Sequence, residues 1–417
     1  MTGSPQLPNE LDGAHDPGAL DQTWRVIDSF AQRCWPVLDA GGVVSPVGAW
    51  LLLALAAGAG RGDGVPSALG LELPQAHARA VELLAAPPRA LRAAVALWVN
   101  AAQRTEAFQA WEQTLTEGLA QTLGPGATGG IPTSAEADAW AARATDGVVS
   151  RFPVSVGPAT SLVLANAVAT DVRWRKPYRL DEVQDWGTGG PWQGLISTVL
   201  LGDDLGALGS ELGLHPVHHA RADGLDVVCV GMPDASIEAA RGLSSTAPLV
   251  RQVLVDGGED LWSLPLGQHG PWLIREEPLP DAPASRVLRT QVRMPAWEVS
   301  TDWDLMADPD LGVQWAAAQV NELLANPGPA QAAQGARARF DRLGFTAAAV
   351  SALAIMRSAP PREQLLQAGV LRTVRADLST PFAVFAFIDQ PESAWHQCLA
   401  FAAWVHLPAD PQQVDST

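Results

Sequence analysis

The fold is decided by one stretch near the carboxyl end, Phe340-Asp341-Arg342-Leu343-Gly344-Phe345-Thr346-Ala347-Ala348-Ala349-Val350-Ser351-Ala352-Leu353-Ala354-Ile355-Met356-Arg357-Ser358-Ala359-Pro360-Pro361. Alanine favours helices over strands and proline ends helices, so intrinsic propensity predicts a helix that stops before Pro360. The same stretch meets the needs of a loop that becomes a central strand, because it has a glycine at its root, small side chains and no interior proline. Both interpretations remain open until the rest of the chain is considered.

The composition indicates a globular protein with a large core. The chain has 417 residues, of which 47% are hydrophobic and 17% are charged, as is usual for folded domains. Its formal net charge of -18 argues against a nucleic-acid partner or an anionic membrane, since both are recognised by basic patches. The longest apolar run, residues 50–59, is too short to span a bilayer.

The cysteines and the first residues bear on the cellular compartment. Cys34, Cys229 and Cys398 form neither a CxxC pair nor a metal-ligand spacing, so we expect buried free thiols. Residues 1–18 are polar and acidic, without the basic start and apolar core of a secretion signal. We therefore expect a cytoplasmic protein with a flexible amino-terminal tail.

Sequence motifs of catalysis and cofactor binding are absent. The sequence contains no GxSxG, HExxH or P-loop pattern. Residues 58–62 do not complete a dinucleotide-binding loop, which needs a glycine where Asp63 stands. His218-His219 has no partner ligands at metal spacing and is interpreted as part of a surface loop. We expect no enzyme activity, no metal ion and no cofactor.

Hydrophobic periodicity outlines the other elements. The expected helices are residues 20–35, 49–57, 106–123 and 137–149, and the expected strands are residues 91–99, 161–169, 382–388 and 399–405. Thr133 and Glu136 form a capping-box pattern before the last of these helices. Residues 181–284 are rich in glycine and proline, which predicts short strands joined by turns.

Six segments between residues 43 and 408 resemble motifs of the serpins, in their family order. They are Ser45-Pro46 through Arg61-Gly62, Asp138-Ala139-Trp140 with Thr145-Asp146-Gly147, Leu162-Val163-Leu164-Ala165-Asn166-Ala167-Val168 through Trp174-Arg175-Lys176-Pro177-Tyr178, Met294-Pro295-Ala296-Trp297, Ala376-Asp377 with Pro381-Phe382, and Phe401-Ala402-Ala403-Trp404-Val405-His406-Leu407-Pro408. The opening stretch resembles the hinge and reactive loop of the same family. The chain is thus identified as similar to the serpins, as a divergent member of bacterial type.

The resemblance implies an α+β fold with three β-sheets, eight or nine surrounding helices and an exposed reactive loop at about residues 344–374. It implies a single domain over residues 19–408 and a C-terminal tail over residues 409–417. The implied function is suicide inhibition of a serine protease. The protease cuts the loop, and the loop enters the large sheet as a new strand while the protease is still covalently attached. We expect a monomer without catalytic residues.

Family spacing from the hinge glycine places the reactive bond at Met356, Arg357 or Ser358. The bond Arg357-Ser358 is favoured, and it suits a trypsin-like protease, whose specificity pocket carries a carboxylate. The bond Met356-Arg357 would instead suit a chymotrypsin-, elastase- or subtilisin-like protease.

Two further groups of residues follow from the resemblance. The hinge corresponds to Gly344, Phe345, Thr346, Ala347, Ala348 and Ala349. A polar cluster beneath the sheet-opening region corresponds to Ser45, Asn166 and Gln334, where Gln334 replaces a histidine that the family often has. Glutamine both donates and accepts hydrogen bonds, so it is able to replace that histidine. Trp174 matches the tryptophan near the entry point of the loop.

Departures from the family pattern bear on whether inhibition is retained. Arg342 stands where the family has an acid, and Phe345 where it has a small threonine. Strand alternation points Phe345 inward on insertion, and overfilling a packed core costs about 1–3 kcal/mol. A rise of about 1.4 kcal/mol in the insertion barrier slows insertion about tenfold. The alternative function is therefore a non-inhibitory binding or chaperone-like protein with the serpin fold.

Overall fold

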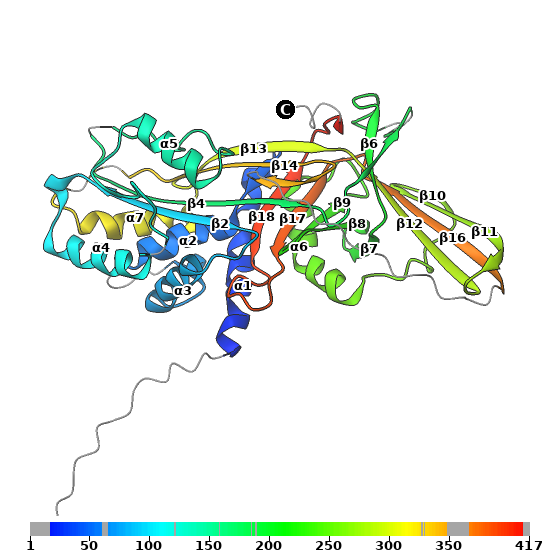
Figure 1. Cartoon of the computed structure of the whole chain (residues 1–417), viewed down its shortest axis with the longest axis horizontal. Coiled ribbons are helices and arrows are strands. Elements are labelled where there is room, and N and C mark those ends of the chain that lie inside the picture. Colours follow the sequence, from blue (N-terminus) through cyan, green and yellow to red (C-terminus); the bar gives the residue numbers. More distant parts are fainter. Residues whose placement is uncertain are drawn as a thin grey trace, which may run out of the picture.

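The computed structural model describes residues 17–60, 66–120, 122–157, 159–184, 186–187, 190–326, 328, 330–347 and 367–411. These residues form the elongated body shown in Figure 1. The α-helices are α1 (Pro17–Ala31), α2 (Pro46–Ala57), α3 (Leu73–Ala85), α4 (Glu106–Gly118), α5 (Ser134–Ala144), α6 (Ala239–Asp256) and α7 (Val313–Glu322). Among the described residues, no helix is both long and apolar enough to cross a membrane.

The described part of the chain holds seven α-helices rather than the eight or nine expected. Four short 3-10 helices accompany them, η1 (Trp35–Leu38), η2 (Ser67–Leu69), η3 (Ala101–Gln103) and η4 (Pro309–Leu311). Two of these short helices end at a glycine with positive φ, Gly70 at 65° and Gly312 at 74°. Such a left-handed residue stops a helix after a single turn.

The strands form three sheets, which confirms the expected α+β architecture. The strands are β1 (Gly42–Val44), β2 (Arg92–Val99), β3 (Thr128–Gly129), β4 (Leu162–Arg173), β5 (Arg179–Glu182), β6 (Thr198–Gly202), β7 (Leu205–Ser210), β8 (Gly213–Arg221), β9 (Leu225–Gly231), β10 (Gly267–His269), β11 (Trp272–Ala282), β12 (Arg286–Met294), β13 (Trp297–Asp304), β14 (Ala333–Phe340), β15 (Gly344–Ala347), β16 (Gln367–Asp377), β17 (Phe382–Ile388) and β18 (Leu399–Val405). We name the sheets by position: the large sheet β13-β14-β15-β4-β2-β3, the central sheet β1-β18-β17-β9-β8-β7 and the arm sheet β10-β11-β16-β12-β6-β5.

Helix α2 lies in the core, between the large and central sheets. Its first turn is set by Ser45, whose Oγ accepts a hydrogen bond from the Gly48 backbone at 3.2 Å, and by Pro46 at the first helical position. This arrangement is a favoured helix start, because a proline there lacks only a donor that would be unpaired anyway. The helix is apolar all round and packs against β4 and β18.

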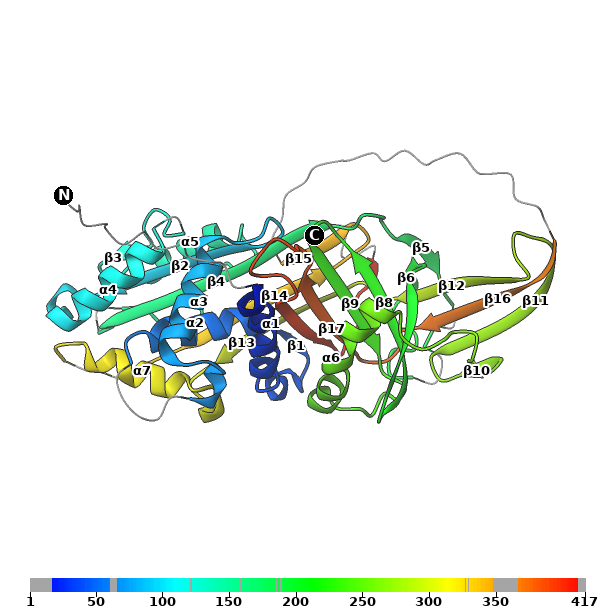
Figure 2. The same ribbon diagram turned by 90° about the horizontal axis from the view of Figure 1, so that it is seen from below.

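The arm sheet projects away from the helical half of the molecule, as Figure 2 shows. Its strand β16 pairs antiparallel with β11 over most of its length and parallel with β12. The strand that follows the expected reactive loop is therefore held on both edges. The residues that form β10 and β11 lie in the glycine- and proline-rich region, for which only short strands were expected.

Several expectations for individual elements have clear outcomes. The predicted strands 382–388 and 399–405 coincide with β17 and β18, and 161–169 falls largely within β4. The helix that propensity predicts is wrong for residues 344–347, which form β15. Here the strand edges on either side outweigh the helical preference of alanine. The three cysteines are buried and free, as expected.

Candidate functional site

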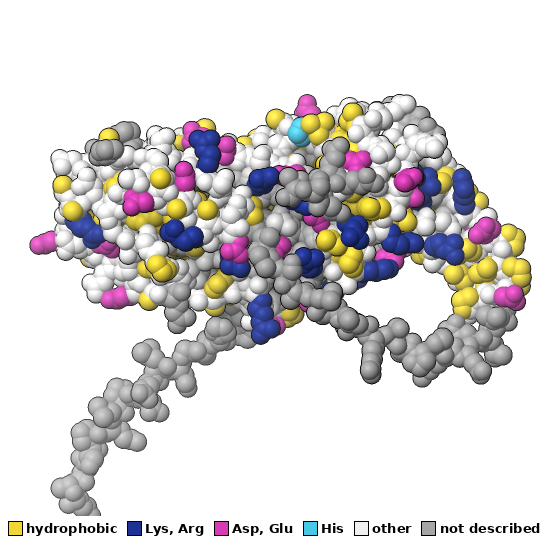
Figure 3. Space-filling view, turned by 45° about the horizontal axis from the view of Figure 1, so that its top comes forward, with side chains coloured by type: hydrophobic (Ala, Val, Ile, Leu, Met, Phe, Trp, Pro, Cys, Tyr) yellow, Lys and Arg dark blue, Asp and Glu magenta, His cyan; other side chains and the backbone are white. Residues whose placement is uncertain are grey.

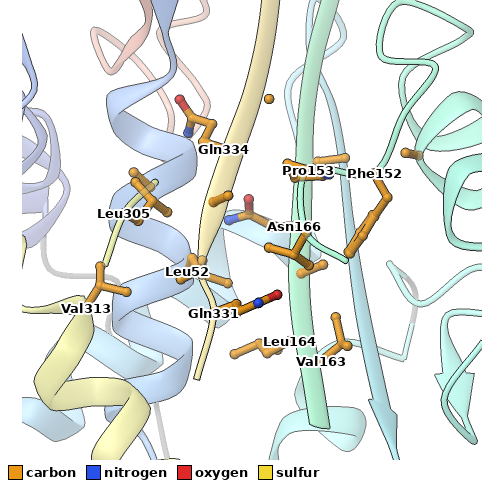
Figure 4. A pocket seen from close by; sticks show the side chains of 18 of the residues that line it. Leu52, Phe152, Pro153, Val163, Leu164, Asn166, Leu305, Val313, Gln331 and Gln334 are labelled. Carbon is orange, nitrogen blue, oxygen red and sulfur yellow. The ribbon is translucent and has the colours of Figure 1, made fainter. Parts of the chain in front are cut away.

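The large sheet is divided at its centre. Strand β15 pairs with β4 on one side and β14 on the other, but no described residue of β4 pairs directly with β14 beyond it. The space between the two strands is a cavity of about 520 Å³. Figure 4 shows Gln331 and Gln334 on one side of this gap, Leu164 and Asn166 on the other, and Leu52 of α2 beneath it. We call this cavity the slot.

A tight turn sends the chain from β14 back into the sheet as β15. The Asp341 Oδ1 atom accepts hydrogen bonds from the backbone N–H groups of Leu343 at 2.7 Å and Gly344 at 3.0 Å. A Cβ atom at Gly344 would lie 2.3 Å from the Val172 carbonyl oxygen, so the approach of β15 to β4 requires glycine. The turn therefore fixes where the new strand begins.

Phe345 is fully inside the protein, with 1% of its surface exposed. Its ring lies in a pocket of aromatic side chains, with centroid distances of 6.5 Å to Trp174, 6.0 Å to Trp297 and 6.4 Å to Phe401. We call Trp174, Trp297, Phe340 and Phe401 the aromatic pocket. The expectation that Phe345 overfills the sheet interior is wrong, because this pocket is already large enough for the ring.

The expected polar cluster is brought together at the slot. Gln334 accepts a hydrogen bond from the Ser45 backbone N–H at 2.8 Å and donates one to the Ser45 carbonyl at 3.0 Å. The Ser45 hydroxyl donates to the Ala400 carbonyl at 2.8 Å, and Asn166 Nδ2 donates to the Gly48 carbonyl at 2.6 Å. The start of α2 is thus bonded to β14 on one side and β4 on the other.

Trp174 lies apart from that cluster, directly after the carboxyl end of β4. Its indole N–H donates to the Asp341 carbonyl at 2.9 Å, and its backbone N–H donates to the Leu343 carbonyl at 3.0 Å. Its ring is 4.6 Å from that of Phe340. Trp174 therefore supports the hinge turn as well as the Phe345 ring.

A buried tyrosine–histidine pair extends the aromatic pocket. The Tyr178 hydroxyl is hydrogen-bonded to His218 Nε2, and His218 Nδ1 is 2.6 Å from the Asp204 carbonyl. Burial lowers the pKa of His218 to about 4, so the ring is neutral at pH 7 and donates from Nδ1. Burial also raises the pKa of Tyr178. The surface-loop interpretation of His218-His219 is wrong, since both residues belong to β8 and His218 is buried.

Parts of the expected site fall outside the described residues, namely Ala348, Ala349, Met356, Arg357 and Ser358. The expected loop of about 344–374 is too long at both ends, because residues 344–347 and 367–374 are strands. In each case the backbone finds partners on two neighbouring strands. Among the described residues no cluster of His, Cys, Asp or Glu is suited to hold a metal ion.

Sequence reasoning missed Asp341, Trp297 and the Tyr178–His218 pair. Asp341-Arg342-Leu343-Gly344 is typical of a turn, since aspartate accepts from backbone two residues on and glycine follows. That signal was available and would have identified the hairpin. Trp297 lies in one of the six segments and His218 was considered as a metal ligand, but nothing in the local sequence gives their roles, because their partners are distant along the chain.

No family model matches the chain, and no curated protein matches it. Several solved structures match the chain in fold. They include human kallistatin (12% identity, 94% of this chain and 99% of the other, TM-score 0.61), human thyroxine-binding globulin in complex with thyroxine (14%, 94% and 100%, 0.59) and Serpin48 of the insect Tenebrio molitor (14%, 94% and 99%, 0.55). Likeness at these identities establishes the fold, and the chain has the fold of the serpins.

Proposed function

We propose that the protein is a serpin-type inhibitor that traps a serine protease after the protease cuts the loop between β15 and β16. The observation that carries the proposal is the half-filled large sheet. Four residues of β15 already lie between β4 and β14, and the slot continues below them along the same two strands. Unpaired edges on either side of a gap offer backbone hydrogen bonds to an incoming strand.

The register of β15 supports continued insertion. Gly344 pairs with Arg173 and Thr346 with Asp171, so a longer strand in this register sets residues 348–355 opposite residues 162–169 of β4. Ser351 then pairs between Asn166 and Gln334, on the side to which Phe345 points. A small hydroxyl enters the polar cluster there, while Ala347 and Ala349 occupy the inward positions above it.

The bait residues that we propose are Arg357 and Ser358, with a trypsin-like protease as the target. Met356-Arg357 is the alternative bond and would suit a subtilisin- or chymotrypsin-like protease. One core cluster contains buried residues from Ile27 to Val405. It supports our proposal that residues 19–408 act as a single domain.

The test is a covalent complex that survives denaturant. The protein is mixed with a trypsin-like and, separately, a subtilisin-like protease, and the products are separated under denaturing conditions. A band at the summed mass, with the carboxyl-side fragment released and its first residue identified, supports inhibition and locates the bond. The matched control is Arg357→Gln, which removes the trypsin-like bait and should leave the subtilisin-like reaction at Met356 in place.

A second candidate function is a non-inhibitory binding protein. The observation that favours it is the slot itself, since a cavity of about 520 Å³ with mostly apolar walls and a few amide groups is typical of small-molecule sites. Complete cutting of the loop without any covalent complex would favour this candidate. Thyroxine-binding globulin, a binding protein by its name, has the same fold.

A further inference from the structure

One face of the arm sheet gathers arginine side chains. Arg275 of β11 and Arg289 of β12 are both paired with Thr373 of β16, so all three side chains lie on the same face. Neighbouring strands are about 4.8 Å apart, which sets the two arginines about 10 Å apart on either side of Thr373. Arg375 follows two residues along β16 and shares this side. Arg293 shares it too, through its pairing with Asp377. We call these residues the arginine face.

The acidic groups on this face do not neutralise it. Asp377 bonds Arg293, with Nε to Oδ1 at 2.8 Å, and the same Oδ1 lies 3.3 Å from Arg375 Nε. Asp181 of β5 also acts by its charge on Arg293 and Arg375, and the exposed Glu277 lies two residues from Arg275 on the same side of β11. The four arginines therefore outnumber the three carboxylates by one. Arg275 and Arg289 are exposed, and no described residue forms an ion pair with either. Burial lowers the pKa of Arg375, the charges of Asp377 and Asp181 raise it, and those of Arg293 and Arg275 lower it further.

The opposite face of the same strands is covered. Arg372 points that way, with 4% of its surface exposed, and it bonds Glu276 at 2.6 Å and the Leu264 carbonyl. The Arg286 guanidinium lies 4.0 Å from the centre of the Trp262 ring. The segment around Trp262 and Leu264 thus shields that face. The arginine face is open to solvent at Arg275 and Arg289, whereas Arg293 and Arg375 are partly covered.

Its charge contrasts with the rest of the chain, which has 45 acidic and 27 basic residues. In Figure 3 the basic side chains gather over the half of the molecule that carries the arm. A long polyanion bound at the arginine face would also be repelled by the acidic remainder of the molecule. A partner with a compact acidic surface therefore fits the arginine face better. Strand β16 also joins the arginine face directly to the cut loop, so a protease bound at the loop lies within reach of it.

We infer that the arginine face docks an acidic surface of the protease that cuts the loop. The inference rests on the proposed function and adds a second contact to it. Complementary charge beside a reaction site speeds encounter, and the gain falls as salt screens it. The bait residues then choose the class of protease by its specificity pocket, and the arginine face chooses within that class by surface charge.

The test uses the full chain and the anionic and cationic isoforms of trypsin. The second-order rate constant for cutting within residues 348–366 is measured at about 20 mM and about 500 mM salt. We expect the anionic isoform to cut faster at low salt and to lose that advantage at high salt. The anionic isoform should cut the variant Arg275→Gln/Arg289→Gln about tenfold more slowly than wild type, whereas the cationic isoform should cut both at the same rate.

Two control variants isolate the arginine face. Arg143→Gln/Arg241→Gln removes the same charge from exposed sites on α5 and α6 and should be cut at the wild-type rates. Arg275→Lys/Arg289→Lys keeps the charge of the arginine face and should recover most of the rate that the glutamine variant loses. Equal losses in the control pair, or no preference between isoforms, would overturn the inference. If the proposed function fails, the result is different: the loop is cut at the normal rates, but no protease is trapped. If neither isoform cuts the loop, the inference is wrong for trypsin-like proteases, and the proposed function is then decided by the separate reaction with the subtilisin-like protease.

Discussion

At the scale of single residues, Phe345 changes its meaning once the structure is known. From the sequence it is an obstacle to insertion, whereas in the fold it occupies the aromatic pocket and holds β15 in place. We predict that Phe345→Thr lowers the free energy of unfolding by about 3 kcal/mol, because truncating a buried phenylalanine leaves a cavity. Urea titration measures this. Phe345→Leu should cost clearly less, and a loss below about 0.5 kcal/mol for threonine would contradict the account.

His218 gives a prediction for pH. Its pKa falls from the ordinary 6.5 to about 4 in the fold, so the unfolded chain binds the proton first as the pH drops. Stability should therefore decrease between about pH 6.5 and pH 4, by about 2 kcal/mol between pH 7.5 and pH 5. His218→Gln keeps a donor and an acceptor but does not titrate. The stability of wild type relative to this variant, measured by denaturant titration at each pH, should show the slope, and a flat difference would exclude it.

At the scale of elements, the position of β16 in its sheet is the new feature. An edge strand tolerates proline wherever its N–H faces solvent, whereas a strand paired on both sides tolerates none. We predict that Thr373→Pro and Val374→Pro each destabilise the protein by about 3 kcal/mol or more relative to alanine at the same position. These neighbouring residues direct their N–H groups to opposite edges. If thermal unfolding shows that one of the two prolines is tolerated, the neighbouring strand on the edge to which that residue directs its N–H does not hold β16.

The elements also show which features were predictable. Ser45-Pro46 and the run from 161 to 169 carry local signals, a helix start and a continuous apolar strand, and both were identified. Strand β15 has a turn signal before it, in Asp341 to Gly344, but no strand signal of its own. One of the two strands that outweigh the helical preference of alanine, β4, lies more than a hundred residues away. The aromatic pocket was missed for the same reason: Trp174, Trp297 and Phe401 meet only in the folded chain.

At the scale of the whole molecule, the large sheet has room for one more full-length strand. If cutting the loop frees residues 348–355 to fill the slot, the cut protein gains hydrogen bonds along both edges and buries apolar surface. With about 1 kcal/mol per hydrogen bond, and an unfolding entropy of about 0.8 kcal/mol/K for a domain of this size, the melting temperature should rise by about 10 °C or more.

The parity of the strand supplies a matched pair of variants. Ala349 would point inward with Phe345, and its neighbour Ala348 would point to the outer face of the sheet. Ala349→Arg places a charge in the core and should abolish the gain on cutting, whereas Ala348→Arg should keep it. The two variants differ only in which side of the inserted strand carries the arginine.

The most direct measurement is the melting temperature of the intact and the cut protein, for wild type and for these two variants. We predict a rise of about 10 °C or more on cutting for wild type and Ala348→Arg, and none for Ala349→Arg. A cut wild-type protein that melts no higher than the intact one would contradict insertion into the large sheet.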